Sequence, residues 1–383
     1  MENKKFLLST HGTFHYFDLA KELNLRKILT KIISGYPKFK LNKYDIESEK
    51  IHSTGFYQIL TQLLGRYKFS NKKILDYLAL INCIKLDLIS SKYINDSNIF
   101  LGLSGTGLST GQKFVEAGKI YICERASAHA QFCDEIYKEE YDKFNYKFHT
   151  SSELMERELA EYQKSSFVLL PSEFAQKTFE NKGFFNAKVI DYPANDSHFF
   201  PIPELKGDNN QFNILYVGGL TIRKGLEYLI DAFNKIKFKN KVLHLVGTKT
   251  FDFKFIENKI DHQHTKIYGH LDQSKINILM NKSQLFVLPS LQDGCSIAVS
   301  QALKTGLPVI VSENTGNESI IKKNNCGYVV PVRNSNILYD KIDHLIENPN
   351  QLKLFSTNAI NFSNNNSWKD YVDKLNQIID NFN

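Results

Sequence analysis

The fold is decided by the stretch Phe286–Gly316, which reads FVLPSLQDGCSIAVSQALKTGLPVIVSENTG. It opens with a short apolar run that Pro289 and Ser290 end, and a polar loop follows. Apolar residues then recur at helical spacing until Gly306, which stands where a helix C-cap belongs. Pro308–Val311 resumes as an apolar run of strand length. Strand, loop, helix and strand in this order predict a βαβ unit with parallel strands.

The loop of this unit has the features of a phosphate site. The backbone N–H groups expected to point outward, just after Gly294, are those of Cys295, Ser296 and Ile297. A helix N-terminus attracts anions because its first N–H groups lack partners within the helix. Asp293 and Gln301 add an acid and an amide to its surroundings. An anion site ringed by hydrogen-bonding groups is what a nucleotide-activated sugar requires.

Length and composition favour two intracellular domains. A chain of 383 residues suits two cores of roughly 150–200 residues each. No apolar run approaches the ~20 residues of a membrane span, and Phe6–Leu8 is too short a run for a signal peptide. The five cysteines are scattered and form no C-x-x-C pair, which is typical of a reducing cytoplasm and argues against disulfides or a structural zinc site. We therefore expect a cytoplasmic protein.

The net charge of +7 is unevenly distributed. The first hundred residues hold 16 Lys/Arg against 9 Asp/Glu, and the next hundred hold 11 against 15. A basic N-terminal region is compatible with an anionic membrane at the inner face or a phosphorylated carrier, and equally with a solvated surface. The basic residues are dispersed, without a regular ladder of basic and aromatic side chains, so nucleic-acid binding is disfavoured.

The N-terminal half alternates predicted strands with predicted helices. Strands are expected at 5–9, 28–34, 98–103, 119–123, 166–170 and 188–192. Helices are expected at 55–66, 72–90 and 172–181. One more begins after residue 13, where Phe14 and Phe17 start an apolar face, and another follows the strand at 98–103 and ends at residue 117. A long charged helical region is expected to reach about residue 163.

Two loops after these strands carry candidate site residues. Gly12 follows the first strand, where a glycine lets the backbone approach a ligand closely. Glu124, Arg125 and His129 follow the strand at 119–123, and ligands bind at the carboxyl ends of strands in open parallel sheets. His129 is interpreted as a site residue, against the alternative of a surface residue with no task.

A change of composition after residue 192 predicts a linker and a second domain. Pro193, Pro201 and Pro203 and the polar run at 206–211 separate two sets of strands and helices. Two such α/β sets predict two Rossmann-like domains that face each other across a cleft. We expect the N-terminal domain over residues 1–200, the C-terminal domain over 209–362, and a final helix within 366–383.

The second domain begins with a turn suited to a diphosphate. Gly218 and Gly219 follow its first strand, and Arg223 and Lys224 come just before a helix. Arginine can bind a phosphate in bidentate fashion and lysine acts as a point charge. No D-x-D pair occurs in the sequence, so we expect these cations, in place of a metal ion, to neutralise the leaving group.

These residues resemble the family 4 glycosyltransferases, which are retaining enzymes of the GT-B fold. The C-terminal motifs that carry the resemblance are Gly218–Gly225, Pro289–Ala302 with Gly306–Val309, and Thr315-Gly316 with Glu318. The N-terminal half is similar to one branch of the family at His11–His15, Glu124–His129 and Pro171–Phe174. Ser367-Trp368 fits the family's last helix, which crosses back to the N-terminal domain.

The resemblance implies a role for individual residues. Lys224 matches the lysine that contacts the donor's diphosphate, and Arg223 stands in for its usual arginine partner, whose place Gly219 takes. The family's glutamate pair falls on Asp293, implied to contact the transferred sugar, and on Gln301, implied to contact the ribose.

Other implied positions surround the donor. Tyr268 and Gly269 are implied to lie near the nucleotide base. Glu124, Arg125 and His129 are implied to line the acceptor side of the N-terminal domain. Retention implies attack on the sugar from the face that the phosphate leaves.

The sequence therefore predicts a retaining, metal-independent hexosyltransferase that needs no cofactor besides its UDP- or GDP-sugar donor. The acceptor is expected to be a glycan or lipid-linked glycan in surface polysaccharide biosynthesis. A nucleotide-sugar epimerase of the same fold remains an alternative, as does a non-catalytic nucleotide-sugar-binding partner subunit, which the amide of Gln301 suggests. A nicotinamide oxidoreductase is disfavoured, because the glycine turn at 105–111 departs from the dinucleotide fingerprint.

Overall fold

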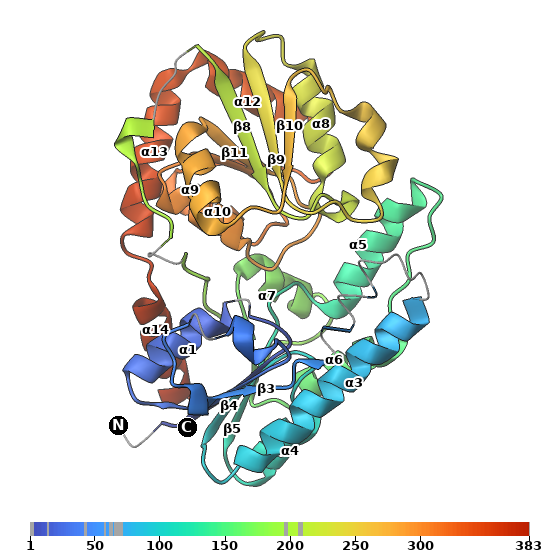
Figure 1. Cartoon of the computed structure of the whole chain (residues 1–383), viewed down its shortest axis with the longest axis vertical. Coiled ribbons are helices and arrows are strands. Elements are labelled where there is room, and N and C mark those ends of the chain that lie inside the picture. The colour runs from blue at the N-terminus through green and yellow to red at the C-terminus, as the bar shows by residue number, and fades with distance from the viewer. Residues whose placement is uncertain are drawn as a thin grey trace.

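The computed structural model describes residues 4–13, 15–41, 44–56, 59–60, 64, 72–194, 198–205 and 210–382. Figure 1 shows two α/β domains, the C-terminal one above the N-terminal one. The strands of each sheet are all parallel to their neighbours. This architecture confirms the predicted pair of Rossmann-like domains.

The N-terminal sheet has seven strands in the order β3-β2-β1-β4-β5-β6-β7. Their bounds are β1 Phe6–Thr10, β2 Leu29–Ser34, β3 Ile51–Ser53, β4 Ile99–Leu103, β5 Ile120–Glu124, β6 Phe167–Leu170 and β7 Ala187–Val189. The helices of this domain are α1 Tyr16–Leu25, α3 Lys72–Ser90, α4 Leu108–Glu116, α5 Ala130–Asp142, α6 Ser152–Lys164 and α7 Glu173–Glu180. The strand order reverses between β1 and β4, which is where ligands bind in such sheets.

Both faces of this sheet are covered because its strands are apolar on both sides. On one face, Phe6 and Leu8 of β1 pack with residues of α1 and of the C-terminal helix. On the other, Leu7 packs with residues of α3, α4, α6 and α7. The predicted strands are thereby confirmed, each within a few residues.

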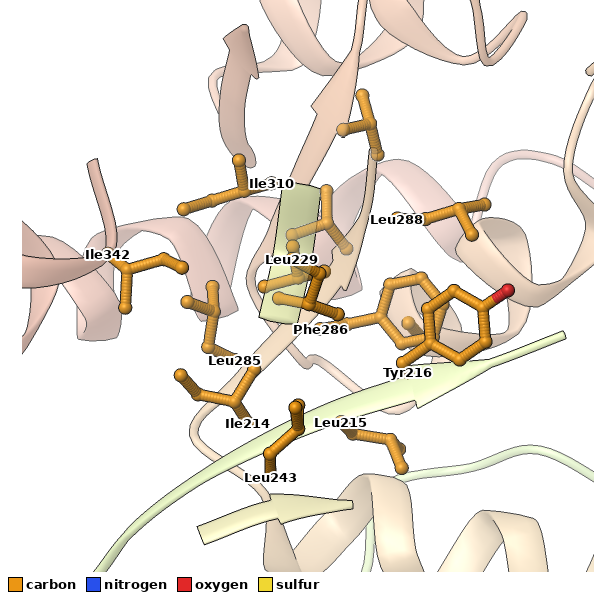
Figure 2. Close-up of a cluster of buried hydrophobic side chains, with 14 of the residues drawn as sticks. Ile214, Leu215, Tyr216, Leu229, Leu243, Leu285, Phe286, Leu288, Ile310 and Ile342 are labelled. Atoms are coloured by element: carbon orange, nitrogen blue, oxygen red, sulfur yellow. The ribbon is translucent and has the colours of Figure 1, made fainter. Parts of the chain in front are cut away.

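The C-terminal sheet has six strands in the order β10-β9-β8-β11-β12-β13. Their bounds are β8 Phe212–Val217, β9 Lys241–Val246, β10 Thr265–Gly269, β11 Leu285–Leu288, β12 Val309–Ser312 and β13 Gly327–Val330. The helices are α8 Leu226–Lys235, α9 Gln273–Lys282, α10 Ile297–Lys304, α11 Glu318–Asn324, α12 Ser335–Glu347 and α13 Pro349–Ser363. Figure 2 shows side chains of β8, β11, β12 and α8 meeting in the core of this domain, among them Ile214, Phe286, Ile310 and Leu229.

The opening stretch forms the predicted βαβ unit. β11 and β12 are parallel neighbours, with Phe286 opposite Val309 and Val287 opposite Ile310, and α10 connects them. Gly306 has a φ of 73° just after α10, so it ends the helix in the left-handed conformation that glycine adopts most easily.

The last helix, α14 (Trp368–Asp380), returns to the N-terminal domain, as the resemblance implied. It begins at a capping box in which Ser367 and Asp370 satisfy each other's backbone N–H groups. It lies beside α1 (Figure 1). Arg26, just after α1, pairs with Asp373 at 2.5 Å.

Two of the predicted helical regions differ from the structure or fall mostly outside its described residues. The charged region up to residue 163 is two helices, because the chain turns after Asp142 with Asn145 in the left-handed conformation at φ 52°. Phe14 and most of the predicted helix at 55–66 lie outside the described residues. Within the described part of the chain, no helix is both long and apolar enough to cross a membrane.

The packing of the C-terminal core leads to a prediction for the free energy of unfolding. We expect Phe286→Ala to lower the free energy of unfolding of that domain by about 3–5 kcal/mol, because it opens a cavity in a fully buried cluster. Urea unfolding followed by circular dichroism measures the change. Phe185→Ala is the control, since Phe185 is exposed and its loss should cost less than about 1 kcal/mol. Equal losses in the two variants would contradict the packing described.

Candidate active site

Arg223 and Lys224 lie on a short 3-10 turn, η5 (Ile222–Lys224), between β8 and α8. The buried carboxylate of Asp252 fixes the start of this turn. It accepts hydrogen bonds from the hydroxyl of Thr221 at 2.6 Å and from the backbone N–H of Ile222 at 2.9 Å. The turn that carries the two cations is therefore fixed by hydrogen bonds to the carboxylate of Asp252.

Gly225 allows this turn to lie directly against the start of the next loop. Its φ is 66°, and an added Cβ would stand 1.8 Å from the carbonyl oxygen of Pro289. Leu291 N–H also donates to the carbonyl of Arg223 at 3.1 Å. Only glycine permits this contact, so the basic turn and the loop after β11 form one unit.

Lys224 and Asp293 form an ion pair in this unit. Their side chains are only 12% and 20% exposed. Burial lowers the pKa of Lys224, and the carboxylate of Asp293 counters part of that shift. Burial alone would also lower the pKa of Arg223, but Tyr137 and Asp293 outweigh it and raise that pKa. The structure thus brings Arg223, Lys224 and Asp293 together, as the two sequence motifs predict.

The loop after β11 is clamped between the domains at Gly294. An added Cβ there would stand 2.4 Å from the carbonyl oxygen of Ala126 in the N-terminal domain. Ser172, at the N-terminus of α7, donates to the carbonyl of Gly294 at 2.5 Å. Gly218 and Gly219 follow β8 at the same edge of the C-terminal sheet, and a Cβ added at Gly219 would lie 3.8 Å from the methyl carbon of Thr221.

One detail of the predicted phosphate loop is wrong. The backbone N–H of Ser296 does not point outward but donates to the side-chain oxygen of Asn317 at 2.9 Å. Asn317 also donates to the buried thiol of Cys295 at 3.3 Å. Ile297 and Gln301 are half-buried on the first turns of α10. The N–H of Ser296 is therefore already bonded, and contact of the Cys295 and Ile297 N–H groups with an anion stays a prediction.

The structure does not place His129, a predicted catalytic residue, on an open surface. Its side chain is buried against Phe179 and Tyr162, and its Nδ1 accepts the backbone N–H of Gln131 at the N-terminus of α5. Burial, followed by the charge of Arg125, lowers the pKa of His129 to about 4. A neutral, buried imidazole that caps a helix has a structural role.

Glu124 is likewise not on an open acceptor surface, because its side chain is buried. Its carboxylate bonds His15 at 2.6 Å and Tyr192 at 2.5 Å. Burial would raise the pKa of Glu124, but its contacts with His15 and the tyrosines lower it on balance. Glu124 therefore joins β5 to the linker that starts after β7, and its implied contact with an acceptor stays a prediction.

Arg125 lies closer to a space that a ligand could enter. It pairs with Glu158 at 2.7 Å and donates to the hydroxyl of Ser104 at 3.3 Å. Glu158 and Ser104 line a cavity of about 290 Å³ together with His11, Ala79, Asn82, Cys83, Gly105 and Leu154. The cavity lies at the carboxyl ends of β1 and β4, the switch point of the sheet.

The remaining candidates, Gly12, Tyr268 and Gly269, lie near the ends of strands. Gly12 is buried beyond β1, where its carbonyl accepts the hydroxyl of Ser34 at 3.0 Å. Tyr268 is near the end of β10 and its hydroxyl bonds His244 at 2.8 Å. Gly269 ends β10 with a φ of 68°. Contact of these residues with a donor stays a prediction.

Sequence reasoning missed the residues of α5 that reach the other domain. Tyr141 donates to Asp252 at 2.6 Å and Tyr137 donates to Gln292 at 2.6 Å. Arg333 of the C-terminal domain pairs with Glu140 at 2.7 Å. The i, i+4 spacing of the two tyrosines, followed by aromatic residues at 144, 146 and 148, is the signal that could have identified this face.

Comparison with protein families identifies part of the chain. Residues 202–362 match the model for glycosyl transferases group 1. An uncharacterized glycosyltransferase of Methanocaldococcus jannaschii is 30% identical over 161 residues, which are 41% of this chain and 45% of that protein. The amylovoran biosynthesis glycosyltransferase AmsK of Erwinia amylovora is 28% identical over 129 residues, 31% of this chain and 32% of that one. The chain thus spans less than half the length of these curated relatives.

Solved structures resemble the whole chain. Sucrose-phosphate synthase of Thermosynechococcus elongatus has a TM-score of 0.75 at 14% identity, over 99% of this chain and 98% of that one. HepE of Anabaena, in complex with UDP and glucose, has a TM-score of 0.73 at 15% identity, over 99% and 100% of the two chains. The C-terminal domain of this protein therefore matches the glycosyl transferases group 1, and the chain as a whole has the GT-B fold.

Proposed function

We propose that this protein is a retaining glycosyltransferase of family 4 type that transfers a hexose from a UDP- or GDP-sugar to a glycan or lipid-linked glycan. The observation that carries the proposal is the ion pair of Lys224 and Asp293, with Arg223 beside it, at the interface of the two domains. The ammonium group of Lys224 suits a diphosphate, and the carboxylate of Asp293 suits sugar hydroxyls. The group 1 match over the same domain supports this reading.

The ion pair explains how the site keeps a buried ammonium charged before the donor binds. Asp293 stabilises the charge of Lys224 in a place where burial disfavours it. A donor would exchange this pair for two new ones, since the diphosphate takes Lys224 and the sugar hydroxyls take Asp293. Arg223 and Lys224 then stabilise the charge that develops on the leaving nucleoside diphosphate. In this proposal two side-chain cations do this without a metal ion.

The acceptor side is proposed to be the cavity beside Arg125. Its polar lining of His11, Ser104 and Glu158 offers hydrogen bonds to hydroxyl groups. Since His129 and Glu124 are both buried in structural contacts, neither supplies a base to the acceptor hydroxyl. In this proposal the departing phosphate acts as the base, which agrees with attack from the same face.

The names of similar proteins favour a role in polysaccharide assembly. One relative acts in amylovoran biosynthesis, and another is named a putative colanic acid biosynthesis glycosyltransferase of Escherichia coli, 22% identical over 157 residues. HepE was solved with UDP and glucose. We place the present protein in the cytoplasm, at the inner face of the membrane, in surface polysaccharide biosynthesis.

A non-catalytic nucleotide-sugar-binding subunit is the second candidate, and Gln301 favours it. The amide is half-buried on α10, where it carries no charge for the ribose hydroxyls. Transfer to an acceptor distinguishes the two candidates. Nucleotide sugars would raise the melting temperature of a binding subunit in thermal-shift assays, but no product would form. An epimerase would change the sugar of its donor without any acceptor present.

The proposed diphosphate clamp, formed by Arg223, Lys224 and Asp293, leads to a prediction for Lys224→Ala. Among UDP-, GDP-, ADP- and CMP-sugars, we expect UDP- or GDP-sugars to raise the melting temperature of the wild type. The variant should lose most of this shift and about 100-fold or more of kcat/KM, because a leaving-group cation is gone. Lys353→Ala on the exposed side of α13 is the control and should match the wild type. Unchanged turnover of Lys224→Ala would disprove the clamp.

The proposed ribose contact predicts a smaller effect at Gln301. Gln301→Ala should weaken UDP or GDP binding about fivefold, since one hydrogen bond is worth ~1 kcal/mol. Gln301→Glu, which restores the family's acceptor, should bind no more weakly than the alanine variant. Isothermal titration calorimetry measures both, with Gln273→Ala on the exposed start of α9 as the control. Wild-type affinity in Gln301→Ala would exclude the contact.

A further inference from the structure

The outward face of α3 exposes a stripe of apolar side chains. These side chains, Ile74, Tyr77, Ile84 and Leu88, are between 41% and 63% exposed. They recur every three, four or seven residues and so share one face of the helix. The opposite face buries Leu78, Cys83 and Leu86. α3 is therefore apolar on two sides, and one of them faces solvent.

Figure 1 shows α3 along the outer edge of the N-terminal domain, away from the C-terminal domain for most of its length. Among the described elements it packs against α4, α6, β1, β2 and the turn η3 (Ser91–Tyr93) that follows it. Scattered exposed apolar residues are ordinary on a soluble protein, but a stripe that follows one helix for four turns indicates a binding surface.

Lysines border this stripe, and each acid of the helix contacts a basic side chain. Lys73 and Lys85 are exposed on α3, and Lys92 is exposed in the turn that follows. The two acids of α3 are both paired, Asp76 with His149 at 3.2 Å and Asp87 with Arg157 at 2.5 Å.

More positive charge gathers at the adjoining edge of the sheet. Besides burial, the charges of Lys31, Lys92 and Lys38 lower the pKa of His52 on β3. The ammonium of Lys31 also lies 4.9 Å from the ring centre of Tyr93, just after α3. This edge adds to the basic excess of the first hundred residues.

We propose that this surface, defined by Ile74, Tyr77, Ile84 and Leu88 with Lys73, Lys85 and Lys92, docks on an anionic lipid bilayer. The apolar stripe would contact the acyl chains of the bilayer, and the lysines that border it would contact the negatively charged headgroups. A protein partner of the same area would not require the excess of positive charge, so charge complementarity selects the lipid surface.

Docking through α3 has a consequence for the acceptor. Ala79, Asn82 and Cys83 on the inner side of the same helix line the cavity that also contains His11 and Glu158. A lipid-linked acceptor would enter this cavity from the bilayer under α3. The purpose of docking thus rests on the proposed function, whereas docking itself does not require catalysis.

The test is sedimentation of the full-length protein with vesicles. The protein should pellet with an equal mixture of phosphatidylglycerol and phosphatidylcholine, less with phosphatidylcholine alone, and less at high salt. The double variant Ile84→Ser and Leu88→Ser should partition about tenfold more weakly, because two inserted apolar side chains are lost. Lys73→Glu with Lys92→Glu should abolish the preference for phosphatidylglycerol.

A matched control uses the other domain. Ile278→Ser with Leu354→Ser removes one exposed isoleucine and one exposed leucine from α9 and α13, and should pellet like the wild type. Unchanged melting temperatures and nucleotide-induced shifts show that each variant is folded. The proposal is overturned if the wild type does not pellet, if control and α3 variants lose binding equally, or if the stripe instead drives self-association that the α3 variants remove. Vesicle binding without any transferase activity would retain this proposal and reject only the proposed function.

Discussion

The carboxylate of Asp252 is the contact on which the geometry of the site depends. It is buried, and its acceptor atoms are filled by Thr221, Ile222 and, from the other domain, Tyr141. Thr250 adds a further hydroxyl contact. A buried charge without such hydrogen bonds would cost several kcal/mol, so the turn around it can adopt few other conformations. The basic turn that presents Arg223 and Lys224 is fixed in this way.

Because Tyr141 belongs to the N-terminal domain, the same carboxylate also couples the turn to the arrangement of the domains. α5 lies against η5 and the C-terminal core, with Tyr137 on Gln292 and Glu140 on Arg333. Its N-terminus is capped by His129, so this histidine acts on the site through the helix that it starts. A residue in a loop at a strand end can thus support a site by positioning a helix without facing the site itself.

The fold could be predicted from the sequence because its signals are local. Apolar runs of strand length, helical spacing and the glycine after α10 each involve a few neighbouring residues, and parallel sheets repeat them. The clamp residues were also predictable, since Arg223-Lys224 and Asp293 lie in turns that parallel topology brings to one edge of the sheet. The burial of Glu124 and His129 was not predictable in this way. It depends on partners such as His15, Tyr192 and Phe179, which are tens of residues away in the chain.

The charges of the clamp give Gln301 a second interpretation. Arg223 and Lys224 supply two positive charges and Asp293 one negative charge, so these three side chains sum to +1 before a donor binds. A glutamate at 301 would bring the sum to zero, whereas the amide leaves it positive. In a partly buried site this residual charge attracts a diphosphate more strongly than a neutral set would. In the proposed function, the amide would give up a charged acceptor for the ribose hydroxyls but keep a stronger field on the leaving group, which is the part of the donor whose charge grows during transfer.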